Sequence, residues 1–480
     1  MLKLNQRSRN MELGDIFLIL ALLHGAILST VVILERRNPS ASLAWIVTAF
    51  FLPGAGAFLY WVLGRRKVRR RRRWRSRYLE QLASLVPPKS SDVDLLGHAQ
   101  RTRLIRLAQR VTGSLAVGGN RLKLLKNALE SYAAILTCIG SARHHVHAEY
   151  YIFRSDPTGR TFATALERAA RRGVEVRVLL DAVGSASTDL NVFAGLKSAG
   201  GQVQLFAPAR IGRSRRLNFR NHRKIVVVDG HTAFAGGINI GDEYLGKDER
   251  LGPWRDTHLL VNGPAARYVQ QTFLEDWCFA SGQVVDGIDY LRDVPPAGDA
   301  VVQVVPSGPD LEWRALHQTL FRAIAASTEK VLITSPYFIP DETMMDALTS
   351  AALAGVDVKL LAPTRSDLPV VLAAGRSYYR ELLEAGVEIH EFLGGFIHAK
   401  TFVIDNWAAS VGSANMDIRS FRLNYEINLL VYDPLFAGEL ETQFMRDLRR
   451  ARQVTLEEHV HRPLSTRLVE GTARVFSPLL

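Results

Sequence analysis

One pattern of residues occurs twice in this chain, and no other feature restricts its possible folds as much. A histidine is followed two positions later by a lysine and seven positions later by an aspartate, and a Gly-(Gly or Ser)-x-Asn segment follows at the same spacing. The matching residues are His222, Lys224, Asp229 and Asn239 in the first copy and His398, Lys400, Asp405 and Asn415 in the second. A chance His-Lys-Asp triad is expected at about one position in 10⁴. Two copies with matched tails therefore indicate a duplicated structural unit.

The segments around the two copies repeat as well. Strand-like, helix-like and strand-like segments follow each other at 146–153, 159–173 and 174–184, and again at 330–340, 342–355 and 356–364. This alternation predicts an α/β fold in which helices flank a mixed β-sheet. We expect the two halves to pair about a pseudo-twofold axis, which would bring one motif from each half to a shared cleft.

The duplication also predicts the domain boundaries. We place the first half at residues 93–294, with its motif segment at about 217–244. The second half is expected at 300–480, with its motif segment at about 393–420. A segment rich in Pro and Gly, residues 293–310, separates the halves.

Two apolar segments precede the duplicated part. Residues 16–34 and 43–63 carry no formal charge, and each is about long enough to cross roughly 30 Å of hydrocarbon as a helix. We predict that residues 1–77 form a transmembrane hairpin, with helices at about 14–34 and 43–63, followed by a basic segment. A cleaved signal peptide is the alternative for the first segment, but a second apolar segment follows it in place of a small-residue cleavage site.

The positive charge of the chain is concentrated at its N-terminus. Residues 1–77 hold 15 Lys and Arg against 3 Asp and Glu, and ten of these basic residues lie between Arg65 and Arg77. The positive-inside rule then places the large C-terminal part in the cytoplasm, and the basic cluster favours contact with anionic lipid headgroups. The other 403 residues hold 45 basic and 44 acidic residues. Since a nucleic-acid groove requires a clear basic excess, nucleic acid is not an expected partner.

The paired motifs have the composition of a phosphoryl-transfer site. Residues i and i+2 of a strand point to the same side, so we expect each histidine and its lysine to face one cleft. Ammonium groups and asparagine amides suit the non-bridging oxygens of a phosphoryl group, where the transition-state charge lies. One imidazole can attack phosphorus while the other donates a proton to the leaving oxygen. Histidine suits both roles because its unperturbed pKa of about 6.5 lies near neutral pH.

A nucleophilic imidazole needs an acceptor for its second nitrogen. Glu426 and Asp256 are the candidate acceptors, and the sequence leaves open which histidine each one holds. Asp229 and Asp405 end their predicted strands, and we interpret them as positioning residues rather than proton carriers. The residues expected to support the phosphate are Asn239, Ser413 and Asn415.

The proposed chemistry requires no metal and no cofactor. His145, His147 and Glu149 alternate along one predicted strand and could suggest a metal site. A strand that borders a polar cleft accounts for them as well, and we predict no metal there. The two cysteines, Cys138 and Cys278, lie in apolar surroundings and are interpreted as core residues.

The chain resembles the phospholipase D superfamily and, along nearly its whole length, the bacterial cardiolipin synthase branch of that superfamily. The paired HxKxxxxD motifs with GxxN tails carry the first resemblance, and the segments GGINIGDEYLG, PWRDTH and GSANMDIRSFRLNYEIN carry the second. RRNPSASLAWIVTAFFLPGAGAFLYWVLGRR looks like the membrane hairpin of that family. The family often has Ser or Gly at the position of Gly237, so this residue is a minor departure that removes one hydroxyl from the first half.

The resemblance implies two phospholipase D-like halves that transfer a phosphatidyl group from one phosphatidylglycerol to another, giving cardiolipin and glycerol through a phosphohistidine. It implies catalytic roles for His222, Lys224, Asp229, His398, Lys400 and Asp405. It also implies a location in the cytoplasmic membrane of a bacterium, with phosphatidylglycerol and anionic membrane lipids as partners.

Other functions remain open on the sequence. The donor could be another lipid such as phosphatidylethanolamine, and water as the acceptor would make the protein a lipid hydrolase. A nuclease would use the same chemistry, but the nearly neutral duplicated part argues against it. A membrane scaffold with an inactive site is disfavoured because all six motif residues are present. The arginines within 210–220 are compatible with docking onto lipid phosphates or with a solvated basic loop.

Overall fold

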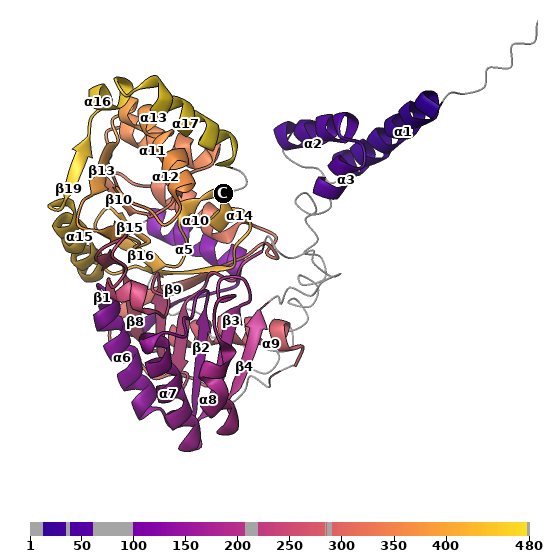
Figure 1. Cartoon of the computed structure of the whole chain (residues 1–480). Coiled ribbons are helices and arrows are strands. Elements are labelled where there is room, and N and C mark those ends of the chain that lie inside the picture. The colour runs from indigo at the N-terminus through magenta and orange to yellow at the C-terminus, as the bar shows by residue number, and fades with distance from the viewer. Residues whose placement is uncertain are drawn as a thin grey trace, which may run out of the picture. The chain divides into compact units, whose positions relative to one another are not determined.

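The computed structural model describes residues 13–34, 39–60, 99–206, 219–283, 285 and 290–477. They belong to two compact units, one that contains the N-terminal helices and one that contains the duplicated part (Figure 1). The basic segment 65–77, the linker at 87–92 and residues 210–218 of the arginine-rich loop lie outside the described residues.

The N-terminal unit contains α1 (Leu13–Leu34), α2 (Pro39–Phe51) and α3 (Ala55–Leu59). The helix α1 coincides with the predicted helix at 14–34, whereas the second predicted segment is not one continuous helix. It is interrupted after Phe51, where Pro53 offers no backbone N–H and Gly54 adopts a left-handed φ of 81°. Among all the residues that the structure describes, no helix is long and apolar enough to cross a membrane.

The first half contributes seven strands to the main sheet. They are β1 (Ala116–Leu125), β2 (His145–Tyr150), β3 (Glu175–Asp181), β4 (Gln202–Phe206), β5 (Ile225–Val228), β6 (Thr232–Gly236) and β8 (His258–Asn262). The helices of this part are α5 (Ala99–Thr112), α6 (Ala128–Ser141), α7 (Pro157–Arg171), α8 (Ala194–Ser198) and α9 (Ala266–Ser281). The strand and helix predictions at 146–153, 159–173 and 174–184 thus correspond to β2, α7 and β3.

The second half contributes eight strands. They are β9 (Ala300–Ser307), β10 (Lys330–Thr334), β12 (Asp357–Pro363), β13 (Glu388–Phe392), β15 (Thr401–Ile404), β16 (Ala408–Gly412), β18 (Glu426–Val431) and β19 (Ala451–Val454). Its helices are α10 (Ala315–Ile324), α11 (Glu342–Leu353), α12 (Pro369–Arg376), α13 (Tyr379–Glu384), α14 (Ile418–Arg422), α15 (Pro434–Leu448), α16 (Leu456–Val460) and α17 (Leu464–Val475).

All these strands form one mixed sheet of 15 strands in the order β19-β13-β12-β10-β15-β16-β18-β9-β1-β8-β6-β5-β2-β3-β4. Reading outward from the β9–β1 junction, β9, β18, β16, β15, β10, β12 and β13 correspond to β1, β8, β6, β5, β2, β3 and β4. The duplicated α/β fold with a mixed sheet is therefore confirmed. The pseudo-twofold relation lies between β1 and β9, which pair in antiparallel fashion.

The junction corrects one prediction and refines another. Residues 293–310 were expected to separate the halves, but the apolar run within them forms β9, a strand in the middle of the sheet. Such a run of apolar residues is typical of a strand that is covered on both faces. The helix α5 lies at the start of the predicted first half, yet Leu104, Ile105 and Ala108 on it pack into the core of the second half.

Helices cover both faces of the sheet (Figure 1). In the first half α6 and α7 pack on one face, and α9 packs on the other through Phe273, Leu274 and Trp277. In the second half α10, α11 and α13 cover one face, while α15 covers the other through apolar residues that include Phe436 and Leu440. This burial keeps both motif strands rigid, because β5 and β15 lie inside the sheet with every residue buried.

Candidate active site

Both motif histidines line one cavity of about 370 Å³. His222 lies just before β5, and His398 lies between β14 (Phe396–Ile397) and β15. The prediction that each His-x-Lys segment lies within a strand is therefore wrong in detail, because the regular pairing of β5 and β15 begins after the lysines. The expected convergence of the two motifs is nevertheless observed, since one histidine from each half faces the same space.

Each histidine is held by a carboxylate from the opposite half. Nδ1 of His222 lies 3.0 Å from both carboxylate oxygens of Glu426, and Nδ1 of His398 lies 2.7 Å from Oδ2 of Asp256. Among the residues that the structure describes, neither Nε2 atom has a hydrogen-bond partner in the protein. Each imidazole is thus anchored on one nitrogen and open on the other.

The sheet register shows that the two carboxylates are equivalent. Gly236 of the first half pairs with His258, and Gly412 of the second half pairs with Asn428. Asp256 and Glu426 each lie two residues before these partners. Their different spacing from the motif asparagines therefore reflects a longer loop in the first half, and both candidates chosen from the sequence occupy the same place in the fold.

Backbone contacts reinforce the exchange between the halves. The N–H of His222 donates to the carbonyl of Tyr425 at 2.9 Å, and the N–H of His398 donates to the carbonyl of Arg255 at 2.7 Å. These acceptors immediately precede Glu426 and Asp256. The position of each histidine relative to its carboxylate is therefore fixed by the main chain as well as by the side chains.

The two carboxylates differ in their surroundings. Glu426 accepts hydrogen bonds from Ser413 at 2.5 Å, Ser420 at 3.0 Å and Asn424 at 3.2 Å. In the first half the position of Ser413 is taken by Gly237, where a Cβ atom would lie 2.1 Å from Oδ1 of Asp256. The missing hydroxyl is therefore replaced by the carboxylate itself, and the halves are unequal, as the sequence suggested.

Burial and charge set the protonation of these pairs. Burial lowers the pKa of His222 to about 4 and also lowers the pKa of His398. Burial raises the pKa of the two carboxylates, but the neighbouring histidines outweigh this effect. His222 lowers the pKa of Glu426, and His398 lowers the pKa of Asp256 in the same way. Each pair therefore consists of a neutral imidazole and an ionised carboxylate at neutral pH.

Both motif lysines are fully enclosed. Lys224 Nζ donates to the carbonyl of His222 at 2.6 Å, and Lys400 Nζ donates to the carbonyl of His398 at 2.5 Å. Lys400 Nζ also lies 2.9 Å from Nδ1 of its own histidine. Burial, helped by mutual repulsion, lowers the pKa of Lys224 to about 7, and burial lowers the pKa of Lys400 to about 8. The expectation that the lysines face the cleft together with the histidines is therefore wrong, because both lysines are buried behind the histidines and neither lines the cavity.

The motif asparagines line the cavity from opposite halves. Asn239 accepts from the N–H of Ile152 at 3.1 Å and donates to the Tyr244 hydroxyl at 3.1 Å. Asn415 donates to Asp417 at 3.2 Å, and its Oδ1 is buried without a hydrogen-bond partner among the residues that the structure describes. That oxygen is available to a ligand donor.

The motif aspartates have a different environment. The carboxylate of Asp229 accepts from the backbone N–H groups of residues 143–145, at the start of β2. Asp405 accepts in the same way from residues 328–330 at the start of β10. Both aspartates have φ of 51°, a conformation that Asp tolerates better than most residues. These contacts are those of positioning residues, and neither aspartate lines the cavity.

Sequence reasoning missed the aromatic walls of the site. The Tyr151 ring lies edge-on to His222 at 5.0 Å, and the Trp254 ring lies 5.1 Å from His398. Tyr337 also lies near His398, at 6.2 Å between ring centroids. Trp254 lies two residues before Asp256, and Tyr151 lies within the predicted strand at 146–153, so both positions were visible in the sequence. No periodicity distinguished them from core aromatic residues.

Charged residues of both signs complete the cavity. The set consists of Arg154, Arg220, Glu243, Asp248, Arg250, Asp367, Asp417 and Arg419. Burial raises the pKa of Asp417 to about 6, and the nearby Glu426 contributes to this rise. Its place in the first half is taken by Gly241, so this acid belongs to one half only.

The histidine-rich strand has a structural explanation. His145 and His147 on β2 both contact Gln270 of α9, at 3.1 and 2.7 Å, and Glu149 is hydrogen-bonded to Asn221. The part of the chain that the structure describes contains no group of three or more His, Cys, Asp or Glu side chains that could hold a metal. Cys278 is buried in the core and Cys138 is only partly buried, and neither forms a disulfide within the described residues.

Known proteins resemble this chain over most of its length. The family described as "Cardiolipin synthase, PLD-like domain" matches residues 135–277 and 320–448, and the family described as "Phospholipase D-nuclease N-terminal" matches residues 17–65. The cardiolipin synthase of Geobacillus kaustophilus is 40% identical over 94% of this chain and 91% of its own. The major cardiolipin synthase of Bacillus subtilis is 37% identical over 98% of this chain and 100% of its own.

A solved structure supports the fold independently. The phosphatidylserine synthase of Haemophilus influenzae superposes with a TM-score of 0.59, covering 78% of this chain and 98% of its own at 16% identity. This likeness shows that the two-half architecture is shared. Together, the crossed pairs of histidine and carboxylate, the family match over both halves and the identity along the whole chain show that this chain belongs to the bacterial cardiolipin synthases, phosphatidyltransferases of the phospholipase D superfamily.

Proposed function

We propose that the cavity between His222 and His398 transfers a phosphatidyl group from one phosphatidylglycerol to another. The observation that carries the proposal is the pair of imidazoles in one cavity, each held at Nδ1 by a carboxylate from the other half and open at Nε2. A neutral imidazole in this state has a lone pair directed at the cavity, as a nucleophile or a general base requires.

The transfer proceeds in two steps. In the first, Nε2 of one histidine attacks the phosphorus and the bond from phosphorus to the glycerol oxygen breaks. The second histidine, which takes up a proton at Nε2 when the anionic lipid binds, donates that proton to the leaving oxygen. Glycerol leaves, and the phosphatidyl group remains bound to the first histidine. In the second step, the second histidine removes the proton from a hydroxyl of another phosphatidylglycerol. That oxygen attacks phosphorus, the phosphorus–nitrogen bond breaks, and cardiolipin is released.

The remaining motif residues stabilise charge. Lys224 and Lys400 lie behind the histidines, where ammonium groups offset the negative charge that develops on the phosphoryl oxygens. Asn239 and Asn415 line the cavity and supply hydrogen bonds, while Ser413 fixes Glu426. Asp229 and Asp405 hold the strands that carry the motifs. The roles of these residues rest on their contacts and on their match to the family pattern.

The N-terminal segments suit an anchor for an enzyme whose substrate is a lipid. We assign residues 1–77 to membrane association, residues 93–294 to the first half and residues 300–480 to the second. The match of residues 17–65 to a phospholipase D N-terminal family supports the first assignment. A hairpin of two membrane-spanning segments, at about 14–34 and 43–63, would place the duplicated part on the cytoplasmic side, where the basic residues at 65–77 face anionic headgroups.

The test is a lipid assay with the purified full chain in detergent micelles. Labelled phosphatidylglycerol is the sole lipid, and wild type is compared with His222→Ala and His398→Ala. His231→Ala, on an exposed turn, is the matched control. We expect cardiolipin and glycerol from wild type and from the control, and neither from the two motif variants.

Other products would identify another function. Phosphatidic acid without cardiolipin means that water is the acceptor and that the protein is a lipid hydrolase. If cardiolipin forms only when phosphatidylethanolamine is added, the phosphatidyl donor is phosphatidylethanolamine rather than phosphatidylglycerol. Full activity in either motif variant contradicts the joint site. If only one of the two single variants retains an acid-labile label from the lipid, the histidine that this variant still contains is the nucleophile.

A further inference from the structure

The helix α17 near the C-terminus turns apolar side chains toward solvent. Leu464, Leu468 and Val475 are 67%, 61% and 75% exposed. Their spacing of four and eleven residues places them in one stripe along the helix. On the other side, Glu470 and Ala473 are buried against the protein. Since a helix at the surface of a soluble domain normally turns its apolar stripe inward, this stripe requires another explanation.

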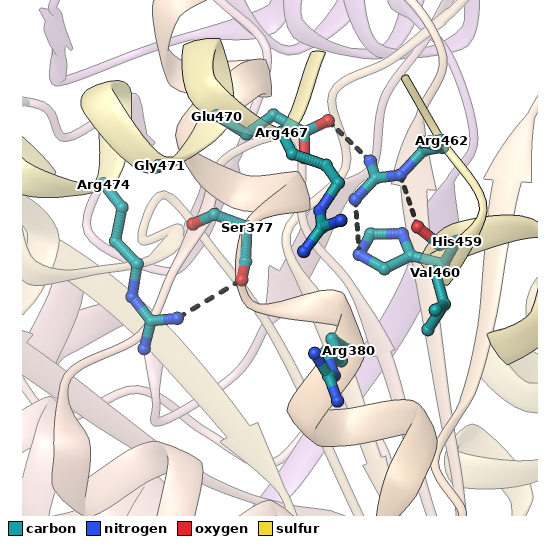
Figure 2. A pocket seen from close by; sticks show the side chains of 9 residues that line it. All are labelled: Ser377, Arg380, His459, Val460, Arg462, Arg467, Glu470, Gly471 and Arg474. Carbon is teal, nitrogen blue, oxygen red and sulfur yellow. Dashed lines mark hydrogen bonds and ion pairs between the residues drawn. The ribbon is translucent and has the colours of Figure 1, made fainter. Parts of the chain in front are cut away.

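A basic cavity adjoins the same helix. It has a volume of about 180 Å³ and is lined by Ser377, Arg380, His459, Val460, Arg462, Arg467, Glu470, Gly471 and Arg474 (Figure 2). We call it the arginine pocket. Its lining carries four guanidinium groups and one carboxylate. Arg467 and Arg474 are seven residues apart on α17, so they form a second stripe at the edge of the apolar one.

Three of the four arginines already contact carboxylates. The pairs are Arg462 with Glu470 at 2.6 Å, Arg380 with Glu384 at 2.8 Å and Arg474 with Glu381 at 3.8 Å. For Arg467, the part of the chain that the structure describes supplies neither an ion pair nor a side-chain hydrogen bond. Its guanidinium group extends between Ser377 and His459 (Figure 2). The arginine pocket therefore retains positive charge where an anion can reach it.

The helix α12 connects the arginine pocket to the catalytic cavity. It packs against α17, and Ser377 at its C-terminal end lines the arginine pocket. Leu368 and Val371 at its other end line the catalytic cavity. With eight residues, the helix is about 12 Å long. Leu368 and Val370 are 47% and 46% exposed, so exposed apolar residues also occur beside the catalytic cavity.

We propose that α12 and α17 form a docking surface for an anionic lipid bilayer. The stripe of Leu464, Leu468 and Val475 enters the acyl-chain boundary, and a lipid phosphate binds in the arginine pocket at Arg467. Apolar residues flanked by basic ones are the arrangement found in helices that lie at a membrane interface. Guanidinium groups suit phosphate because they present paired donors.

Charge and apolar exposure together select a lipid over a free ion. A soluble phosphate would satisfy the arginines but would leave the apolar stripe in water. A lipid satisfies both, and docking through α12 would bring the catalytic cavity to the surface that holds its substrate. The docking surface does not depend on the transfer chemistry, so its test requires no enzymatic turnover.

The test places an environment-sensitive fluorophore on the apolar stripe of the full chain. The label is attached at Leu468→Cys in a background with Cys138→Ala and Cys278→Ala, and the protein is reconstituted in vesicles of phosphatidylcholine with or without phosphatidic acid. We expect emission at shorter wavelength, and quenching by nitroxide groups on the acyl chains, in the vesicles that contain phosphatidic acid. Arg467→Glu combined with Arg474→Glu should abolish both effects.

The helix α15 supplies matched controls. Leu435 on this helix is 86% exposed, and Arg446 and Arg449 near its end are exposed arginines. A label at Leu435→Cys should report water in every vesicle, and Arg446→Glu combined with Arg449→Glu should leave the Leu468 signal unchanged. Equal melting temperatures of the two double variants in detergent confirm that both fold.

Four outcomes overturn the docking surface. One is a Leu468 label that remains in water on vesicles with phosphatidic acid. Another is an equal shift on phosphatidylcholine alone, which excludes recognition of an anionic headgroup. A shift produced by inorganic phosphate without anionic lipid assigns the arginine pocket to a free anion. A shift that grows with protein concentration in detergent means that a second copy of the chain covers the stripe.

Discussion

At the scale of single residues, the site depends on reciprocal contacts. Glu426 belongs to the second half and holds His222 of the first, while Asp256 belongs to the first half and holds His398 of the second. Neither half contains a complete pair of histidine and carboxylate. Each carboxylate keeps its imidazole in the tautomer whose Nε2 carries the lone pair, so removal of either charge should impair catalysis through the opposite histidine.

We therefore expect Asp256→Asn and Glu426→Gln each to lower kcat for cardiolipin formation by about two to four orders of magnitude. The exchange between halves is tested by ¹⁵N NMR of labelled histidine, in which Asp256→Asn should change the signals of His398 and leave those of His222 in place. Asp433→Asn, at the N-terminus of α15, is the control carboxylate. Unchanged kcat in the Asp256 variant would contradict the role of that residue.

The enclosed lysines predict a pH dependence of phosphate binding. Their pKa values of about 7 and about 8 mean that the ammonium groups of Lys224 and Lys400 lose their protons as the pH rises through this range. A short-chain phosphodiester inhibitor, which does not titrate there, should bind less tightly by up to about tenfold per pH unit above the lysine pKa values.

The same lowered pKa values act on stability with a defined sign. Between about pH 7 and pH 10 the unfolded chain binds more protons at these lysines than the folded chain does, so the folded state should gain stability as the pH rises.

Inhibition constants measured from pH 6 to pH 9 check the binding prediction. Affinity that is independent of pH would show that the ammonium groups do not act on the phosphate.

At the scale of elements, equivalent strands of the two halves are followed by different residues. Gly236 on β6 and Gly412 on β16 occupy the same register position, but the next residue is Gly237 in the first half and Ser413 in the second. The shorter carboxylate of Asp256 occupies the space that a serine side chain would need. The first half therefore combines an aspartate with a glycine at the positions where the second half has a glutamate and a serine.

A serine at position 237 should consequently inactivate the enzyme rather than restore a lost hydroxyl. Its Cβ would lie 2.1 Å from Asp256 Oδ1, so the carboxylate must move away from His398. We expect Gly237→Ser to reduce kcat as strongly as Asp256→Asn and to destabilise the fold by about 1–3 kcal/mol. Gly140→Ser on α6, where a Cβ meets nothing within 4 Å, is the matched control. Activity equal to wild type would refute the steric argument.

At the scale of the whole molecule, the duplicated part is one sheet rather than two. The strands β1 and β9 join the halves through antiparallel pairing, and the short pair of β7 (Trp254–Arg255) and β14 crosses between them again beside the site. The two halves therefore share hydrogen-bonded strand pairs both at their junction and beside the active site. Neither half would keep these contacts if it were separated from the other. The duplicated part should behave as a single cooperative unit.

We expect the two halves to unfold together. In hydrogen exchange followed by mass spectrometry, β2 and β10 should lose protection at the same denaturant concentration. A cavity made in the junction strand by Val304→Ala, at a fully buried position, should lower both midpoints equally, with a cost of about 0.5–2 kcal/mol. Leu353→Ala, at an exposed position on α11, should change neither. Separate midpoints for the two strands would show that the halves are independent domains.

The sequence by itself determined the duplication, the α/β class, the two motifs and most of the elements that carry them. These follow from local periodicity and from fixed spacings, which are properties of short segments. It also identified Glu426 and Asp256 as the partners of the histidines. The break in the second N-terminal segment after Phe51 and the strand β9 within a Pro- and Gly-containing segment were not predicted, because turn residues and apolar residues compete there within a few positions.

Only the tertiary structure decided how the halves exchange groups. Which carboxylate meets which histidine depends on the pairing of β7 with β14 and of residue 221 with residue 425, contacts between segments more than 140 residues apart. The enclosure of the lysines, the space taken by Asp256 beside Gly237 and the arginine pocket depend on the same long-range packing. Spacing along the chain carries no information about these distances, because they are set by the register of strands that meet only in the folded sheet.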